Sequence, residues 1–153
     1  MLNPTDIETI KNTTKEFFEK TTFEVEVEVL PEKEQTVPIN LEMDEPQVLI
    51  GEGGQTLFEI QHILKNILKR KIEDLSYIDL DINEYKQKKI EYLKEMARSA
   101  ADEVALTKKE KELAPMPAYE RRIIHMELAE RTDVVTDSVG LEPERRVIIR
   151  VHP

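Results

Sequence analysis

Apolar and polar residues follow each other in a pattern that predicts one helix and two strands at the start of the chain. Apolar side chains recur at helical spacing through residues 7–18, which predicts an amphipathic helix over 4–20. Residues 23–29 and 37–43 alternate between apolar and polar, as half-buried strands do. A turn-forming sequence at 31–34 separates them, so the two strands are expected to form a hairpin.

A short helix, a glycine-rich loop and a long helix follow the hairpin. Residues 47–50 can form one helical turn after a proline, and apolar residues recur at helical spacing over 57–72. Gly51-Glu52-Gly53-Gly54 lies between them and holds three of the four glycines of the chain. A third alternating strand is predicted over 78–82. The expected order is therefore helix, strand, strand, helix, helix, strand.

The rest of the chain carries a second set of elements. A charged helix with a seam of small residues is predicted over 84–112, and a second helix over 117–131. Two strands are predicted over 134–136 and 146–151, around a turn at Gly140. We therefore predict an α+β fold that consists of two small domains in tandem.

The predicted domains, residues 1–83 and 84–153, differ in charge. The net charge of −10 belongs to the first domain, which holds 18 acidic and 8 basic side chains. This balance argues against generic nucleic-acid binding, for which a basic domain is expected. Charges are screened beyond roughly 8 Å at physiological ionic strength, so local binding by a small patch is compatible with it.

Several classes of function find no support in the sequence. The chain has no cysteine, which excludes disulfides and thiolate metal sites, and no run of 18 apolar residues that predicts membrane insertion. The N-terminus lacks the features of a signal peptide, so a cytoplasmic protein is expected. No serine lies in a nucleophile elbow, and the three histidines lack metal-ligand spacing. We predict a protein that is no enzyme and uses no metal or cofactor.

The glycine loop suits a phosphate, because a loop that opens a helix directs free N–H groups and the positive end of the helix dipole outward. Its G-x-x-G spacing and the order of elements around it resemble a KH domain, a three-stranded sheet with helices on one face. In KH domains this loop clamps about four nucleotides of a single strand by their backbone. The resemblance places Gly51, Glu52, Gly53 and Gly54 at that backbone. A row of His62, Lys65 and Lys69 on the following helix would lie alongside it.

Arg121 and His125 lie one helical turn apart within the string Tyr-Glu-Arg-Arg-Ile-Ile-His. This string resembles the R-3-H domain, named for its Arg-x-x-x-His signature, and implies that Arg121, Arg122 and His125 contact single-stranded nucleic acid. A KH domain followed by an R-3-H domain is similar to the Jag (SpoIIIJ-associated) family of bacteria. The family is tied to RNAs of cell elongation and division. Many members carry a further N-terminal domain, which this chain is expected to lack because it begins at the KH unit.

Three residues leave alternatives open. Glu52 stands where Jag-type loops usually have basic residues, and a like-charge pair near a protein surface costs on the order of 1–4 kcal/mol, which predicts weak or selective RNA binding. Apolar residues surround Arg121 and His125, so a structural role is the alternative to RNA contact.

The leading hypothesis is a binder of single-stranded RNA, with single-stranded DNA as a second ligand to test. The competing hypothesis is a protein-interaction module with little RNA affinity. On that hypothesis the acidic first domain pairs with another KH protein or with a second copy of the chain.

Overall fold

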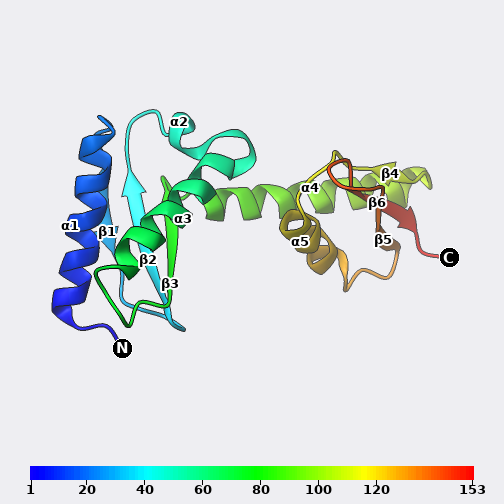
Figure 1. Ribbon diagram of the computed structural model, residues 1–153. Coiled ribbons are helices and arrows are strands. Elements are labelled where there is room, and N and C mark those ends of the chain that lie inside the picture. Colours follow the sequence, from blue (N-terminus) through cyan, green and yellow to red (C-terminus); the bar gives the residue numbers. More distant parts are fainter. The chain divides into compact units, whose positions relative to one another are not determined.

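In the computed structural model, which describes residues 1–153, the chain forms two units, Met1–Lys86 and Gln87–Pro153. The prediction of an α+β fold is confirmed, because five α-helices accompany two three-stranded sheets (Figure 1). The domain limits predicted at residues 83 and 84 stay a prediction. Each unit is described by itself below.

The first unit has the predicted order of elements. These are α1 (Pro4–Lys20), β1 (Glu26–Val29), β2 (Thr36–Glu42), α2 (Gln47–Ile50), the 3-10 turn η1 (Glu52–Gly54), α3 (Gln55–Lys69) and β3 (Tyr77–Ile82). The hairpin prediction is confirmed, since β1 pairs antiparallel with β2, and β3 then joins β2 in parallel. Helix α1 begins at a capping box, in which Asn3 Oδ1 accepts the Asp6 N–H at 2.8 Å and Asp6 Oδ2 accepts the Asn3 N–H at 3.0 Å.

Helices α1 and α3 lie on the same side of the first sheet and cover one of its faces (Figure 1). The alternating pattern of the strands places their apolar side chains on this covered face. The core side chains come from α1 (Ile10, Phe18), β2 (Val37, Ile39, Leu41), α3 (Leu57, Leu64, Leu68) and β3 (Ile78, Leu80, Ile82). The opposite face is polar and acidic, and Glu26 of β1 lies directly across from Glu42 of β2.

The second unit contains most of α4 (Tyr85–Thr107), then β4 (Lys111–Glu112), α5 (Ala118–Leu128), β5 (Val134–Val139) and β6 (Arg146–Val151). The strands form an antiparallel sheet in the order β4-β6-β5. Most of the predicted seam of α4 is buried in one core with α5 and β6: Leu93, Ala97, Ala100 and Val104. Ala101 joins them, and Ile90, the first residue of the predicted seam, is half-buried. This core positions α5, which carries the Arg-x-x-x-His signature.

The predicted elements of the second unit differ in extent from those observed: α5 is shorter than the predicted 117–131, and β5 is longer than the predicted 134–136. The largest difference is in the first helix. The helix predicted over 84–112 ends at Thr107, because Lys108 adopts a left-handed φ of 59°, and residues 111–112 form β4 instead. The segment is held there by the sheet, since the Leu113 N–H donates to Val147 O at 2.9 Å. No glycine or proline marks this helix end, so the polar sequence that follows gives no local signal for a strand.

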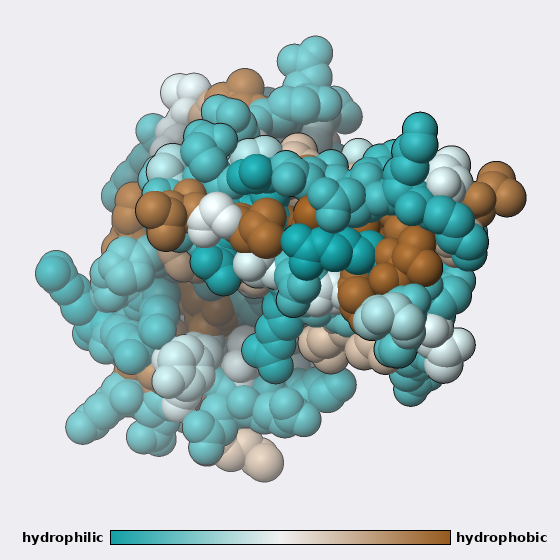
Figure 2. Space-filling model, turned by 90° about the vertical axis from the view of Figure 1, so that its right-hand side faces the viewer, coloured by the Kyte–Doolittle hydropathy of each residue, from teal (hydrophilic) through white to brown (hydrophobic).

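On the face that Figure 2 shows, the surface is mostly hydrophilic and the hydrophobic side chains lie in separate patches. None of the helices is long and apolar enough to cross a lipid bilayer. No group of three or more histidine, cysteine, aspartate or glutamate side chains is arranged to hold a metal ion.

Candidate nucleic-acid interface

The glycine loop has a backbone that other residues would not readily adopt. Gly51, Gly53 and Gly54 all have positive φ, at 72°, 59° and 81°. Gly51 also has ψ of −179°, a region that is essentially restricted to glycine. A Cβ on Gly51 would lie 2.1 Å from Thr56 Oγ1, whereas a Cβ on Gly53 would meet nothing within 4 Å. Gly51 therefore fixes the loop by both conformation and space, and Gly53 leaves it open to solvent.

Two backbone N–H groups at the tip of the loop have no acceptor within the protein. The Gly51 N–H donates to Gln47 O at 2.9 Å and the Gly54 N–H donates to Gly51 O at 3.3 Å, but the N–H groups of Glu52 and Gly53 make no such bond. Both residues are exposed, and no side chain caps the start of α3. The tip therefore offers two free donors beside the positive end of a helix dipole, an arrangement that suits a phosphate oxygen.

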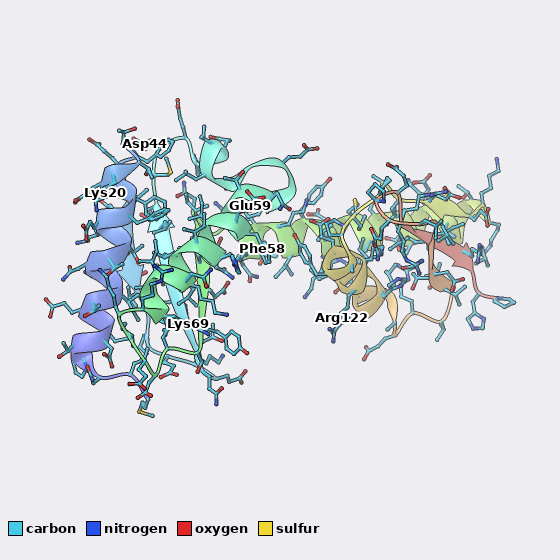
Figure 3. All side chains as sticks on the ribbon, viewed as in Figure 1. Lys20, Asp44, Phe58, Glu59, Lys69 and Arg122 are labelled. Carbon is cyan, nitrogen blue, oxygen red and sulfur yellow. The ribbon has the colours of Figure 1, made fainter.

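The charges around the loop oppose an anion. Glu52 is exposed at the tip, and Glu59 lies one turn into α3, where its carboxylate accepts a hydrogen bond from Gln55 at 3.0 Å (Figure 3). A helix rises 1.5 Å per residue, so His62 and Lys69 lie roughly 12 Å and 22 Å along the axis from Gly54. Both distances exceed the screening length of roughly 8 Å, so these cations do not offset the charge of Glu52 at the tip.

The predicted basic row on α3 is divided between two environments. His62 and Lys69 are exposed and make no hydrogen bond or ion pair, and Lys69 lies near the C-terminal end of α3 (Figure 3). Lys65 is half-buried, and its Nζ lies 4.5 Å from the centre of the Tyr77 ring of β3. Such a cation–π contact contributes about 0.5–1 kcal/mol at an exposed site. Lys65 thus has an internal partner, and Tyr77 is a neighbour that the sequence did not indicate.

One backbone group at the free edge of β3 is occupied by a side chain that was not predicted. Gln61 Oε1 accepts the Leu80 N–H of β3 at 2.9 Å and a hydrogen bond from Lys86 Nζ at 3.0 Å, and Lys86 also pairs with Asp79. An edge strand otherwise presents unpaired N–H groups to a partner chain. Gln61 occupies one of these groups, so a ligand that approached Leu80 would have to displace it. Nothing in the spacing of Gln61 or Lys86 signals this contact.

Arg121 is buried and holds two separated parts of the second unit. Its side chain is 8% exposed. Nη1 donates to Met116 O at 2.6 Å, in the segment before α5, and Nη2 donates to Glu142 Oε1 at 2.9 Å, in the connection from β5 to β6. A guanidinium donates through a fixed fork, so one side chain can hold both acceptors at once. Arg121 therefore anchors α5 to the segment before it and to the connection from β5 to β6.

His125 connects α5 to the adjacent strand β5. Its Nδ1 lies 2.7 Å from Thr136 Oγ1 and its Nε2 lies 3.0 Å from Ser138 Oγ. A neutral imidazole has one donor and one acceptor, and hydroxyl groups can complement either, so both nitrogens are satisfied. Burial lowers the pKa of His125 below its usual value, and nearby Arg121 lowers it further, against an opposing effect of Asp137. Arg121 and His125 thus make their contacts within the second unit, whereas the neighbouring Arg122 is exposed and makes no hydrogen bond or ion pair.

The lowered pKa of His125 predicts a loss of stability on mild acidification. The unfolded chain has an ordinary histidine pKa of about 6.5, so it takes up a proton more readily than the folded protein. The contribution of neutral His125 is complete above that pH and is lost as the pH falls toward the lower folded pKa. We expect the melting temperature of the full chain to fall between pH 7 and pH 5, and His125→Gln to reduce this fall.

The matched control is His62→Gln, which alters an exposed histidine of the other unit. It should leave the pH dependence of the wild type in place. An equal fall in His125→Gln and in the wild type would contradict a role for His125 in this response.

Comparison with known proteins finds a domain family and several relatives of this chain. A model of the R-3-H domain matches residues 91–151. The chain is 39% identical over 118 residues to "RNA-binding protein KhpB" of Clostridium symbiosum, which covers 77% of the chain and 53% of that protein. It is 32% identical over 120 residues to the protein of the same name from Bacillus subtilis, covering 77% of the chain and 58% of the relative. The match in Lactiplantibacillus plantarum is 33% identical over 114 residues and covers 74% of the chain and 35% of the relative. The chain therefore spans about a third to three fifths of the length of these relatives.

Proposed function

The chain belongs to the Jag-type proteins, with a KH-like unit followed by an R-3-H domain, and from this premise we propose that it binds single-stranded RNA. The R-3-H domain is a nucleic-acid-binding module, and the relatives are named for RNA binding, so the proposal is one of a binder without catalytic activity. A cytoplasmic location and a role with RNAs of cell elongation and division are part of the same proposal.

The observation that carries the proposal is the pair of free N–H groups at Glu52 and Gly53. Gly51 holds them in an exposed turn, and no other residue type fits readily at its position. Both N–H groups lie directly before the N-terminal end of α3. Backbone donors of this kind bind phosphate oxygens without regard to base sequence. We propose that the loop clamps the backbone of about four nucleotides, in the manner of a KH domain.

His62 and Lys69 would then contact a more distant part of the same strand. They lie roughly 12 and 22 Å from the loop along α3, so neither can share the phosphate held at Glu52. Lys65 would contribute less, because it is engaged with Tyr77. On this proposal the loop provides the first contact, Glu52 weakens it, and the exposed cations provide a separate electrostatic contact.

The competing proposal is a protein-interaction module. It is favoured by the acidic open face of the first sheet, where Glu26 faces Glu42 in register. Like charges in directly opposite positions destabilise a sheet, and a basic partner would relieve the repulsion. Pairing with another KH protein or with a second copy of the chain belongs to this proposal. RNA itself would avoid such a face.

A salt titration separates the two proposals. We expect the full chain to bind a labelled single strand of mixed sequence at low salt. The logarithm of the binding constant should fall with the logarithm of salt concentration by roughly 0.7 per phosphate contact. Fluorescence anisotropy measures this directly, and a DNA strand of the same sequence reports the preference for RNA. Absence of binding at the lowest salt would favour the protein-interaction module.

A charge reversal at the tip locates the contact within the same titration. Glu52→Lys replaces a repulsion with an attraction, so RNA affinity should rise by tenfold or more, as a change of about 1.4 kcal/mol or more implies. The matched control is Glu28→Lys, which makes the same charge change on the open face of the first sheet. Equal gains in the two variants would mean that the loop does not face the RNA backbone.

A further inference from the structure

The arginines of the second unit are almost all engaged within the protein. Seven arginines lie between Gln87 and Pro153, and six of them donate to a carboxylate or to a backbone carbonyl: Arg98, Arg121, Arg131, Arg145, Arg146 and Arg150. The exception is Arg122, which is exposed and makes no hydrogen bond or ion pair. Its side chain extends away from α5 (Figure 3). A phosphate can therefore bind Arg122 without breaking an existing contact.

Arg122 is the middle of three exposed side chains along the outer side of α5. Tyr119 precedes it by three residues and Met126 follows it by four, so the three lie on the same side of the helix. Tyr119 is 55% exposed and Met126 is 65% exposed. The opposite side of α5 is buried through Glu120, Ile124 and Leu128. We call Tyr119, Arg122 and Met126 the outer stripe of α5.

The chemistry of the outer stripe fits an unstacked nucleotide. A guanidinium binds a phosphate through charge-assisted hydrogen bonds and can also stack on a base. A tyrosine ring gives a surface on which a base stacks, and a methionine side chain adapts to an irregular apolar partner. Duplex nucleic acid would leave Tyr119 and Met126 unused, because its bases are stacked within the helix. The combination of a cation without an internal ion pair, an exposed aromatic ring and an exposed methionine favours a single strand.

The signature residues cannot take this role without loss of internal contacts. Arg121 would have to release both Met116 O and Glu142, and the Met116 carbonyl would be left without its donor. His125 would have to release Thr136 or Ser138. An unsatisfied buried carbonyl is costly, so these contacts favour the internal arrangement. The side of α5 that the signature occupies is the side that packs on the fold.

We propose that the outer stripe of α5 is the nucleic-acid contact of the second unit, and that Arg121 and His125 are positioning residues that hold α5 in place. The ligand is one or two nucleotides of single-stranded RNA, with a phosphate at Arg122 and a base against Tyr119 or Met126. This inference rests on the proposed function, which supplies the RNA, but it assigns the contact to residues outside the Arg-x-x-x-His signature.

The test compares single substitutions in the full chain with a labelled single-stranded RNA of mixed sequence at low salt. Arg122→Ala is expected to lower affinity roughly 5- to 100-fold and to reduce the salt dependence by about one phosphate contact. Tyr119→Ala is expected to lower affinity with little change in salt dependence, because stacking is not ionic. The matched control is Lys109→Ala, which removes an exposed cation of the same unit that has no side-chain partner.

Three outcomes distinguish the possible failures. Wild-type affinity in both Arg122→Ala and Tyr119→Ala, with clear binding by the wild type, would overturn the outer stripe and leave the proposed function intact. Absence of binding by the wild type would overturn both. Unchanged RNA binding together with loss of binding to an acidic peptide, poly-glutamate, in Arg122→Ala would assign the stripe to a protein partner. Arg122→Ala and the wild type should have the same melting temperature. A loss of affinity in this variant is then due to a lost contact with RNA and not to unfolding.

Discussion

Arg121→Ala is expected to destabilise the second unit by about 3 kcal/mol. We expect a much smaller loss of stability from the same substitution at the adjacent Arg122. The bond to Met116 O is buried, and a buried carbonyl left without its donor costs about 1–3 kcal/mol. The bond to Glu142 adds less, since the Glu142 side chain is 61% exposed and exposed ion pairs contribute about 0–1 kcal/mol. Loss of the buried arginine stem adds a packing term.

The prediction can be measured as hydrogen exchange of the β6 amides in the full chain, which reports the opening of the second unit alone. Arg121→Lys should be intermediate, because an ammonium cannot hold Met116 O and Glu142 in the same forked geometry. Arg122→Ala is the matched control, and it should change stability by less than about 0.5 kcal/mol as an exposed residue without partners. Equal protection of β6 in Arg121→Ala and Arg122→Ala would refute the anchoring role of Arg121.

The contrast between Arg121 and Arg122 shows how much of the site the sequence could predict. The spacing of Arg121 and His125 placed both on one side of a helix, and the structure agrees with that placement. Sequence could not tell which side of α5 packs on the sheet, because apolar residues extend over a wide arc around the signature. That choice depends on the core that Ile124 and Leu128 share with α4 and β6, whose residues are distant in sequence. Local spacing contains no information on them.

More of the fold than of the site could be predicted from the sequence, because local patterns determine most of the helices and strands. Alternation predicted the three strands of the first sheet, and helical spacing predicted α1 and α3. Strand β4 was missed, since it is two residues long and exists through its pairing with β6. The hydrogen bond from the Leu80 N–H of β3 to Gln61 was missed for the same reason, because it joins residues 19 apart in sequence.

The glycine loop could be predicted in part. Its three glycines indicated an unusual backbone, and the structure gives all three positive φ. The sequence could not show which of the three glycines the loop needs most. The φ and ψ of Gly51 lie in a region essentially restricted to glycine, and its missing Cβ makes room for Thr56. Position 53 requires glycine only for its left-handed backbone conformation, because a Cβ there would meet no atom within 4 Å.

Gly51→Ala is therefore expected to disrupt the loop, and Gly53→Ala to leave it largely in place. At Gly51 the backbone conformation costs about 1–3 kcal/mol for an L-residue, and the contact of 2.1 Å with Thr56 Oγ1 adds to it. At Gly53 an alanine would adopt a left-handed conformation without a clash, which costs about 1–2 kcal/mol. If the free N–H groups of Glu52 and Gly53 hold the RNA, Gly51→Ala should lower affinity at least tenfold.

A double-mutant cycle with Thr56 separates space from conformation. Thr56→Ala removes Oγ1, the nearest atom to the missing Cβ, but retains the Thr56 backbone and a Cβ at the position that lies 2.7 Å away. Gly51→Ala combined with Thr56→Ala should therefore regain part of the stability lost by Gly51→Ala alone, measured by denaturant unfolding of the full chain. RNA affinity should recover in the same proportion, because it depends on the shape of the loop. Stability regained without affinity would mean that the RNA does not contact the amides that Gly51 positions.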